Sequence, residues 1–241
     1  MRSTIGTAPG APHIPFNSTP LRRLLAGWTA EARPGRVPPA PADDAVAERL
    51  GQWLAWTDAV DLSAALVQPP APVADGATGA PPVAVLAQAL TRLQADMTRQ
   101  ITTDPVYLPG QASATTAPGL AGEDEVAPYR RAAQARQRAM AAAVPPLRAR
   151  LRAALAAGSP AQARLAALDA TLEAALAGRE RSLLAGLVAP LAQRLRTLRD
   201  SGDPGWRLRF HQDQQQLLLA ELDLRLQPLH GLLDALRQEA A

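Results

Sequence analysis

The sequence predicts an all-α protein: an antiparallel helical bundle with three long C-terminal helices, preceded by shorter helices on flexible Pro/Ala-rich linkers. Hydrophobic residues make up 47% of the 241-residue chain, but only 3% of its residues are aromatic, and alanine and leucine dominate. Such a composition suits helices better than strands. From residue 124 onwards, apolar residues recur at steps of three and four, the period of one helix face. Gly-Ser-Pro and Gly-Asp-Pro interrupt this pattern, and each combines a helix stop with a helix start.

Residues 1–42 are predicted to be a mobile tail with one short helix. Eight of the 23 prolines lie in this stretch. Thr19 and Pro20 have the residue types of an N-cap and a first helical position. The sequence LRRLLAGWTA then predicts a short helix that ends before Pro34.

Residues 43–103 are predicted to form two helices joined by a Pro-rich linker. Asp43 or Asp44 can cap the first helix, which runs to about Gln68. The linker QPPAPVADGATGAPP follows, since its five prolines and two glycines cannot hold a helix. The second helix covers residues 83–103. Residues 104–123, rich in Pro, Gly, Ala and Thr, are predicted to be a further, disordered linker.

Residues 124–241 are predicted to fold as a three-helix antiparallel core. In the first long segment, Arg136 and Gln137 interrupt the apolar face for one turn. The tight turns at 158–160 and 202–204 should send each helix back along the one before. In the second segment the apolar face is made of leucines: Leu165, Leu168, Leu172, Leu176, Leu183, Leu187, Leu191, Leu195 and Leu198. The prolines inside these patterns should kink or break the helices: Pro145, Pro146, Pro190 and Pro228.

Composition and motifs exclude several classes of function. The chain has no cysteine, so it forms no disulfide, no thiolate metal site and no cysteine nucleophile. No HExxH, GxSxG, Walker or GxGxxG pattern occurs, and we expect neither an enzyme nor a cofactor. We expect a cytoplasmic protein without a transmembrane segment, because no signal-peptide core and no long apolar window occur. The net charge is only +3, and the pI of 10.4 is high because every basic residue is arginine.

The stretch ERLGQWLAWTDAVDLSAAL, residues 48–66, has the most pronounced local signature. On a helix, Trp53 lies on a broad apolar face and Trp56 nearer its flank, while Asp58 and Asp61 are surface neighbours. The two carboxylates could hold a metal or serve acid–base chemistry, but no Glu-x-x-His motif accompanies them. We favour a tryptophan anchor beside a polar flank. Compatible with this is a candidate partner surface made of Trp53, Trp56, Asp58 and Asp61.

Arginines between 130 and 152 are the strongest charge feature. Seven arginines and no acid lie in this stretch. Five of them fall within about one quadrant of a helix, beside the apolar face; this basic stripe comprises Arg130, Arg131, Arg138, Arg148 and Arg152. It could bind the phosphates of nucleic acid or of an anionic membrane. We favour a solvated helix face whose charge is balanced by acidic residues on neighbouring helices, such as Glu173 and Glu180.

Four stretches carry a family resemblance that covers nearly the whole chain apart from its tail and linkers: ERLGQWLAWTDAVDLSAAL, YRRAAQARQRAMAAAVPPLRARLRAALA, SPAQARLAALDATLEAALAGRERSLLA and LLLAELDLRLQPLHGLLDALR. They resemble an uncharacterised proteobacterial family that is defined only as a domain of unknown function. The resemblance implies no catalytic residue. It implies gene neighbours for proton-channel-like and OmpA-like envelope proteins, and hence a cytoplasmic accessory of an envelope complex.

We therefore expect a non-enzymatic helical scaffold or adaptor that offers helix faces to a protein partner. The alternative function is nucleic-acid or anionic-surface binding through the basic stripe. The sequence assigns no oligomeric state.

Overall fold

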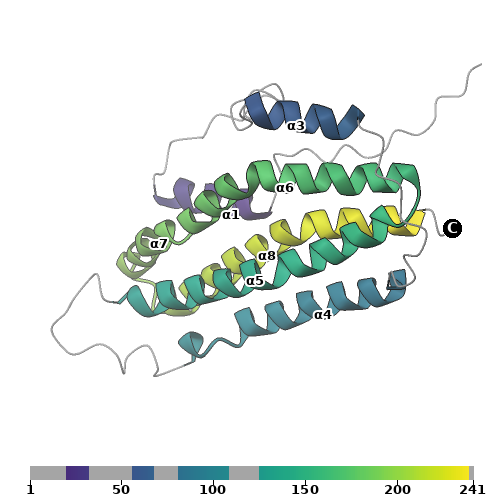
Figure 1. The fold of residues 1–241 in the computed structure, drawn as a ribbon. Helices are drawn as coiled ribbons and strands as arrows, with labels where there is room; N and C mark the ends of the chain where they lie inside the picture. Colours follow the sequence, from purple (N-terminus) through teal and green to yellow (C-terminus); the bar gives the residue numbers. More distant parts are fainter. Residues whose placement is uncertain (1–19, 33–55, 68–80, 109–124, 239–241) are drawn as a thin grey trace, which may run out of the picture.

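The computed structural model describes residues 20–32, 56–67, 81–108 and 125–238. Within these ranges every regular element is a helix (Figure 1), which confirms the all-α prediction. In chain order they are α1 (Pro20–Ala32), α3 (Trp56–Val67), α4 (Val83–Thr102), η2 (Pro105–Tyr107), α5 (Ala127–Ala156), α6 (Pro160–Gly186), α7 (Ala189–Asp200) and α8 (Trp206–Gln238).

The long helices lie side by side as an up-and-down bundle (Figure 1). α5 packs against α6 and α8, and α7 packs against α8. The sequence predicted a three-helix core in residues 124–241, and α4 packs on α5 and α8 and adds its own buried side chains to this core. Its buried side chains are Leu86, Leu90, Met97 and Ile101. These four residues recur at helical spacing, so α4 buries one continuous stripe against the two longer helices.

Both predicted turns contain residues that the sequence singled out, Ser159 in the first and Gly202 and Asp203 in the second. Ser159 and Gln162 form a capping box at the start of α6, in which the Ser159 hydroxyl accepts from the Gln162 backbone N–H at 3.3 Å. Gly202 has a φ of +74°, a left-handed conformation that favours glycine. In the same turn, the Asp203 carboxylate accepts from the Gly205 N–H at 2.8 Å. Local hydrogen bonds therefore end one helix and begin the next.

The internal prolines have different outcomes. α6 ends at Gly186 and α7 begins at Ala189, with Pro190 in its first turn, where a missing N–H costs little. In contrast, α5 runs through Pro145 and Pro146, and α8 runs through Pro228. Buried residues within two positions of these prolines anchor the helix on both sides: Val144, Leu147, Leu226 and Leu229. The helix breaks only where proline coincides with a first turn.

The predicted linker 104–123 begins later than expected. Asp104 is buried, and its carboxylate accepts from the Val106 N–H at 3.1 Å to start η2. The same carboxylate lies 3.2 Å from Nε of Arg136 on α5. The start of this stretch is therefore part of the fold, and the prediction of a linker was wrong for residues 104–108. The remaining residues 109–124, like the predicted tail 1–19, lie outside the described ranges.

The polar turn in the face of α5 belongs to a buried polar network. Gln137 donates from Nε2 to the Leu184 carbonyl at 2.8 Å and to Oε2 of Glu221 at 2.9 Å. Leu184 lies in the last turn of α6, where carbonyl groups lack helical partners. Glu221 is fully buried and receives two hydrogen bonds from the Arg225 guanidinium. Gln137 thus satisfies a helix end and a buried carboxylate.

α1 is held on the bundle by one arginine of α7. Arg194, with only 5% of its surface exposed, donates from Nε to Oδ2 of Asp213 at 2.6 Å. It also pairs with Glu31 at the end of α1, and its guanidinium lies 5.6 Å from the ring centre of Trp28. Leu21 and Trp28 are the buried apolar anchors of α1. A charge network and two apolar side chains therefore fix this short helix.

Candidate protein-interaction surface

The leucines of α6 face mostly away from the bundle core. Only Ala166 and Leu184 of this helix are buried. Leu165 and Leu172 are each 38% exposed and Leu183 is 56% exposed. Two further leucines, Leu168 and Leu176, are half-buried. The expectation that the leucine pattern of this segment marks its core face was therefore wrong for α6, although Leu191, Leu195 and Leu198 of α7 are buried.

The side of α6 that faces α5 is polar because its carboxylates form ion pairs with two arginines of α5. Arg148 donates from Nε to Oδ2 of Asp169 at 2.8 Å and from Nη2 to Oδ1 at 2.6 Å. Arg152 lies 3.2 Å from Oδ2 of Asp169 and also pairs with Glu173. Burial acts to lower the pKa of Arg148, but its hydrogen bond with Asp169 and the nearby carboxylates raise it above the usual value. A fixed charge pairing therefore turns the acidic face inward and leaves the leucines outside.

α3 packs on α6 from outside the bundle (Figure 1). Its own apolar side chains are incompletely buried, with Val60 49% and Val67 80% exposed. We name the exposed apolar residues of both helices the α3–α6 surface: Val60, Val67, Leu165, Leu172 and Leu183. By helical spacing, Leu165, Leu172 and Leu183 share one face of α6, and an exposed apolar face is typical of a protein-interaction site.

The structure places the predicted tryptophan surface only in part. Trp53 lies outside the described residues. Trp56 is the first residue of α3, and its side chain is not described. The side chain of Asp58 is likewise not described, whereas Asp61 is exposed on α3. Among the described residues, no group of three or more His, Asp or Glu side chains is placed to hold a metal ion. Asp61 is therefore the one member of this set whose exposure the structure gives, and it lies on the helix that packs on α6.

The basic stripe divides into two parts. Arg148 and Arg152 form ion pairs with Asp169 and Glu173, so the expected pairing with Glu173 is present. Glu180 instead lies 4.0 Å from Arg225 of α8. The other three members, Arg130, Arg131 and Arg138, are exposed, and none has an ion pair with another residue in the described ranges. The accessible charge is therefore smaller than five arginines on one face would supply.

A family model described as "Protein of unknown function (DUF3348)" matches residues 9–238. The chain belongs to this family. The resemblance to a family of unknown function is thereby confirmed. No curated protein and no solved structure matches the chain. In the part of this DUF3348 member that the structure describes, no helix is long and apolar enough to span a bilayer.

An aromatic cluster lies at one end of this DUF3348 bundle, and sequence reasoning missed it. The Tyr129 hydroxyl and Nε2 of His211 are 2.9 Å apart, and the Tyr129 ring packs edge-on against Phe210. The Tyr107 ring lies 5.4 Å from the His211 ring. Burial raises the pKa of both tyrosines, while burial and then the charge of Arg207 lower that of His211. The cluster therefore brings η2, the start of α5 and the start of α8 into contact with one another.

Proposed function

We propose that the chain is a non-enzymatic helical adaptor or scaffold that binds a protein partner on its α3–α6 surface. The observation that carries this proposal is the outward leucine face of α6. Fully burying a leucine side chain contributes about 1.5–3 kcal/mol, and Leu165, Leu172 and Leu183, which are 38–56% exposed, would each contribute a part of this. A partner helix that covers Leu165, Leu172 and Leu183 would therefore gain apolar burial that the isolated chain lacks.

The charge pairing between α5 and α6 supports the same proposal. Asp169 and Glu173 hold α6 against Arg148 and Arg152, so the leucine face is presented on a fixed helix. A preorganised surface loses less conformational entropy when it binds. The family resemblance supports a finer form of the proposal, in which the adaptor is a cytoplasmic accessory of an envelope complex.

The distribution of the arginines gives the alternative function, nucleic-acid or anionic-surface binding, weaker support. Arg148 and Arg152 already contact carboxylates, and a phosphate would have to displace these. The exposed members, Arg130, Arg131 and Arg138, lie in the first half of α5. Three arginines supply sequence-independent attraction to phosphate. However, the one aromatic residue of α5, Tyr129, is buried, so α5 offers no exposed ring on which bases could stack.

Site-specific photo-crosslinking in the native host tests the adaptor proposal. A photo-reactive residue at position 172 should capture one discrete protein, whereas the same residue at Ala141, exposed on α5, should not. The variant Leu165→Ser/Leu183→Ser should remove the captured band without lowering the melting temperature by more than a few degrees, because both leucines are exposed. Equal capture from positions 172 and 141, or a band that persists in this variant, would overturn the proposal.

A further inference from the structure

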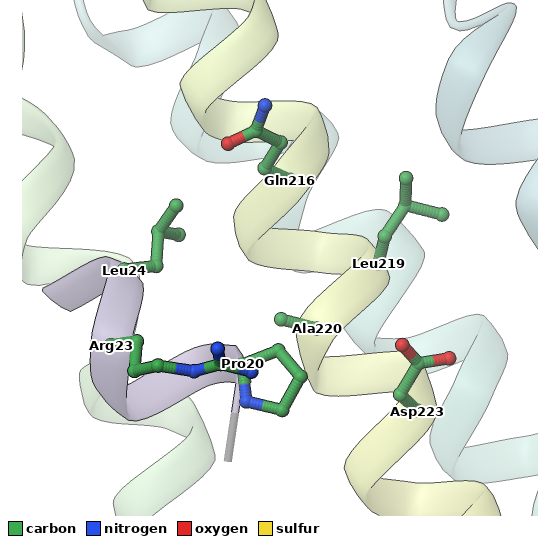
Figure 2. A pocket seen from close by; sticks show the side chains of 7 residues that line it. All are labelled: Pro20, Arg23, Leu24, Gln216, Leu219, Ala220 and Asp223. Carbon is green, nitrogen blue, oxygen red and sulfur yellow. The ribbon is translucent and has the colours of Figure 1, made fainter. Parts of the chain in front are cut away.

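An open groove of about 380 Å³ lies between α1 and α8 (Figure 2). Ala220 forms its floor, and because this side chain is small, the two helices leave space above it. Leu24 of α1 and Leu219 of α8 form apolar walls. Both leucines are only partly buried, so the groove presents apolar surface that the described residues do not cover. The volume lies at the lower end of the range of ligand pockets, which begins near about 300 Å³.

The polar rim of the groove carries two charges. Arg23 of α1 and Asp223 of α8 both line it, and neither forms an ion pair with a residue in the described ranges. Figure 2 shows Pro20 beside Ala220, with Leu24 on the side of Gln216. The groove therefore has a direction, from Pro20 and Asp223 at one end to Leu24 and Gln216 at the other.

We propose that this groove binds the segment His13–Phe16 of the same chain, with Ile14 and Phe16 against Leu24 and Leu219. The chain enters the groove wall at Pro20, the first residue of α1. The sequence immediately before it is HIPFNST, so the large apolar residues Ile14 and Phe16 stand six and four positions upstream. A covalently tethered segment has an effective concentration in the millimolar range, which no free ligand of equal chemistry matches.

The tether of residues 17–19 is long enough for the segment to fold back into the groove. An extended chain spans at most about 3.3–3.6 Å per residue, so Phe16 can lie up to about 14 Å from Pro20. The groove between Asp223 and Gln216 extends over seven helical residues, or about 10 Å. Asn17, Ser18 and Thr19 stand between, and these residue types favour turns and helix caps. The segment can therefore reverse at 17–19 and reach the whole groove.

The chemistry of the segment also fits the rim. Residues 1–30 contain no acid, while His13 and Arg2 are basic. The carboxylate of Asp223 therefore meets no like charge from this segment. Pro15 lowers the conformational entropy of the segment before docking and so lowers the entropy lost on docking. Apolar contacts and charge thus favour the same occupant.

Disulfide trapping tests the proposal cleanly because the chain has no cysteine of its own. The pair Pro12→Cys and Gln216→Cys places one thiol just before the segment and one at the far end of the groove. A disulfide needs Cα atoms about 4.4–6.8 Å apart, so its formation reports docking. The matched control is Pro12→Cys with Gln227→Cys, which lies on nearly the same face of α8 but about 16 Å further towards its C-terminus.

A docked segment should oxidise with Gln216→Cys at least about tenfold faster than with Gln227→Cys, given the difference in effective concentration. Adding Ile14→Ser and Phe16→Ser should reduce this ratio to about twofold or less, since only tethering then remains. Both serine changes lie in the tail, so the melting temperature should stay within a few degrees and exclude misfolding. Equal rates in the two pairs overturn the proposal. A disulfide-linked dimer in place of the intramolecular bond overturns it as well, since the segment then occupies a second copy.

Discussion

Arg148 of α5 and Asp169 of α6 form a two-pronged ion pair, with Nε donating to Oδ2 at 2.8 Å and Nη2 to Oδ1 at 2.6 Å. Each side chain has only 12% of its surface exposed. Two parallel charge-assisted hydrogen bonds in a partly buried position are stronger than a surface pair. This contact decides which side of α6 faces the bundle.

Asp169→Ala should therefore lower the free energy of unfolding by about 2–3 kcal/mol, because charged hydrogen bonds are lost and Arg148 is left with one weaker contact. Urea denaturation followed by circular dichroism measures this change. The control is Asp96→Ala, which removes an exposed pair with Arg99 on α4 and should cost less than about 1 kcal/mol. Losses of similar size in both variants would show that the α5–α6 pair does not fix the helix.

A second prediction concerns the fully buried Glu221. Its carboxylate receives hydrogen bonds from Gln137 and Arg225, and the Arg225 side chain is itself only 12% exposed. Glu221→Ala should cost about 3–5 kcal/mol, since it leaves a partly buried guanidinium without its main partner. The control on the same helix is Asp234→Ala, whose pair with Arg237 is exposed and worth less than about 1 kcal/mol. Equal urea midpoints for the two variants would disprove this role of Glu221.

Helix ends were the part of the fold that local sequence could predict. Ser159 with Gln162, and Gly202 with Asp203, act on backbone groups a few residues away, so the signal and its consequence are adjacent. The face of α6 could not be predicted in the same way. A helical repeat of leucines indicates an apolar face, but its neighbour depends on Arg148 and Arg152, which lie on another helix.

The basic stripe shows the same limit. Its five arginines do share one side of α5 by helical spacing, and the sequence predicted acidic answers from neighbouring helices. Which arginines form ion pairs with acidic residues depends on how α6 is aligned along α5. This alignment follows from the turn and the capping box at Ser159. The polar turn at Arg136 and Gln137 was visible in the sequence, but its partners Asp104 and Glu221 are 32 and 84 positions away.

A third prediction concerns the attachment of α1. Trp28→Ala removes one of two buried anchors and the contact with Arg194, at a cost of about 3–5 kcal/mol. A 13-residue helix is marginal alone, so α1 should detach while the bundle stays folded. Trypsin should then cleave after Arg23 before any site in α8, as mass spectrometry of the first products can show. Leu25→Ala, at a half-buried position of α1, is the control and should leave Arg23 protected.

A fourth prediction concerns pH. The pKa of His211 is lowered from its usual 6.5 by burial and by Arg207, so the folded chain binds this proton less readily than the unfolded chain. Its contribution to stability is complete above about 6.5 and is lost as the pH falls from there to the folded pKa. The melting temperature should therefore drop as the pH falls below about 6.5. His211→Gln should reduce this drop, whereas His230→Gln, at an exposed position of α8, should retain it.

The last prediction separates the two classes of partner. If all five arginines of the basic stripe bound phosphates, the slope of log affinity for duplex DNA against log salt would be about −4 to −5. Because Arg148 and Arg152 are engaged by Asp169 and Glu173, three exposed arginines remain, and we expect a slope no steeper than about −3. Binding near physiological salt should then be no tighter than the weak, sequence-independent level, with Kd of about 10⁻⁴–10⁻⁶ M.

Two charge-reversal variants test the physical reason for this expectation. Arg130→Glu/Arg131→Glu/Arg138→Glu changes exposed side chains and should leave the melting temperature nearly unchanged while it removes the residual DNA binding. Arg148→Glu sets a like charge against Asp169 and should lower the melting temperature by several degrees with little effect on DNA binding. Sub-micromolar DNA or RNA affinity at about 0.15 M salt, lost in the triple variant, would instead make the exposed half of the stripe a nucleic-acid site and displace the adaptor proposal.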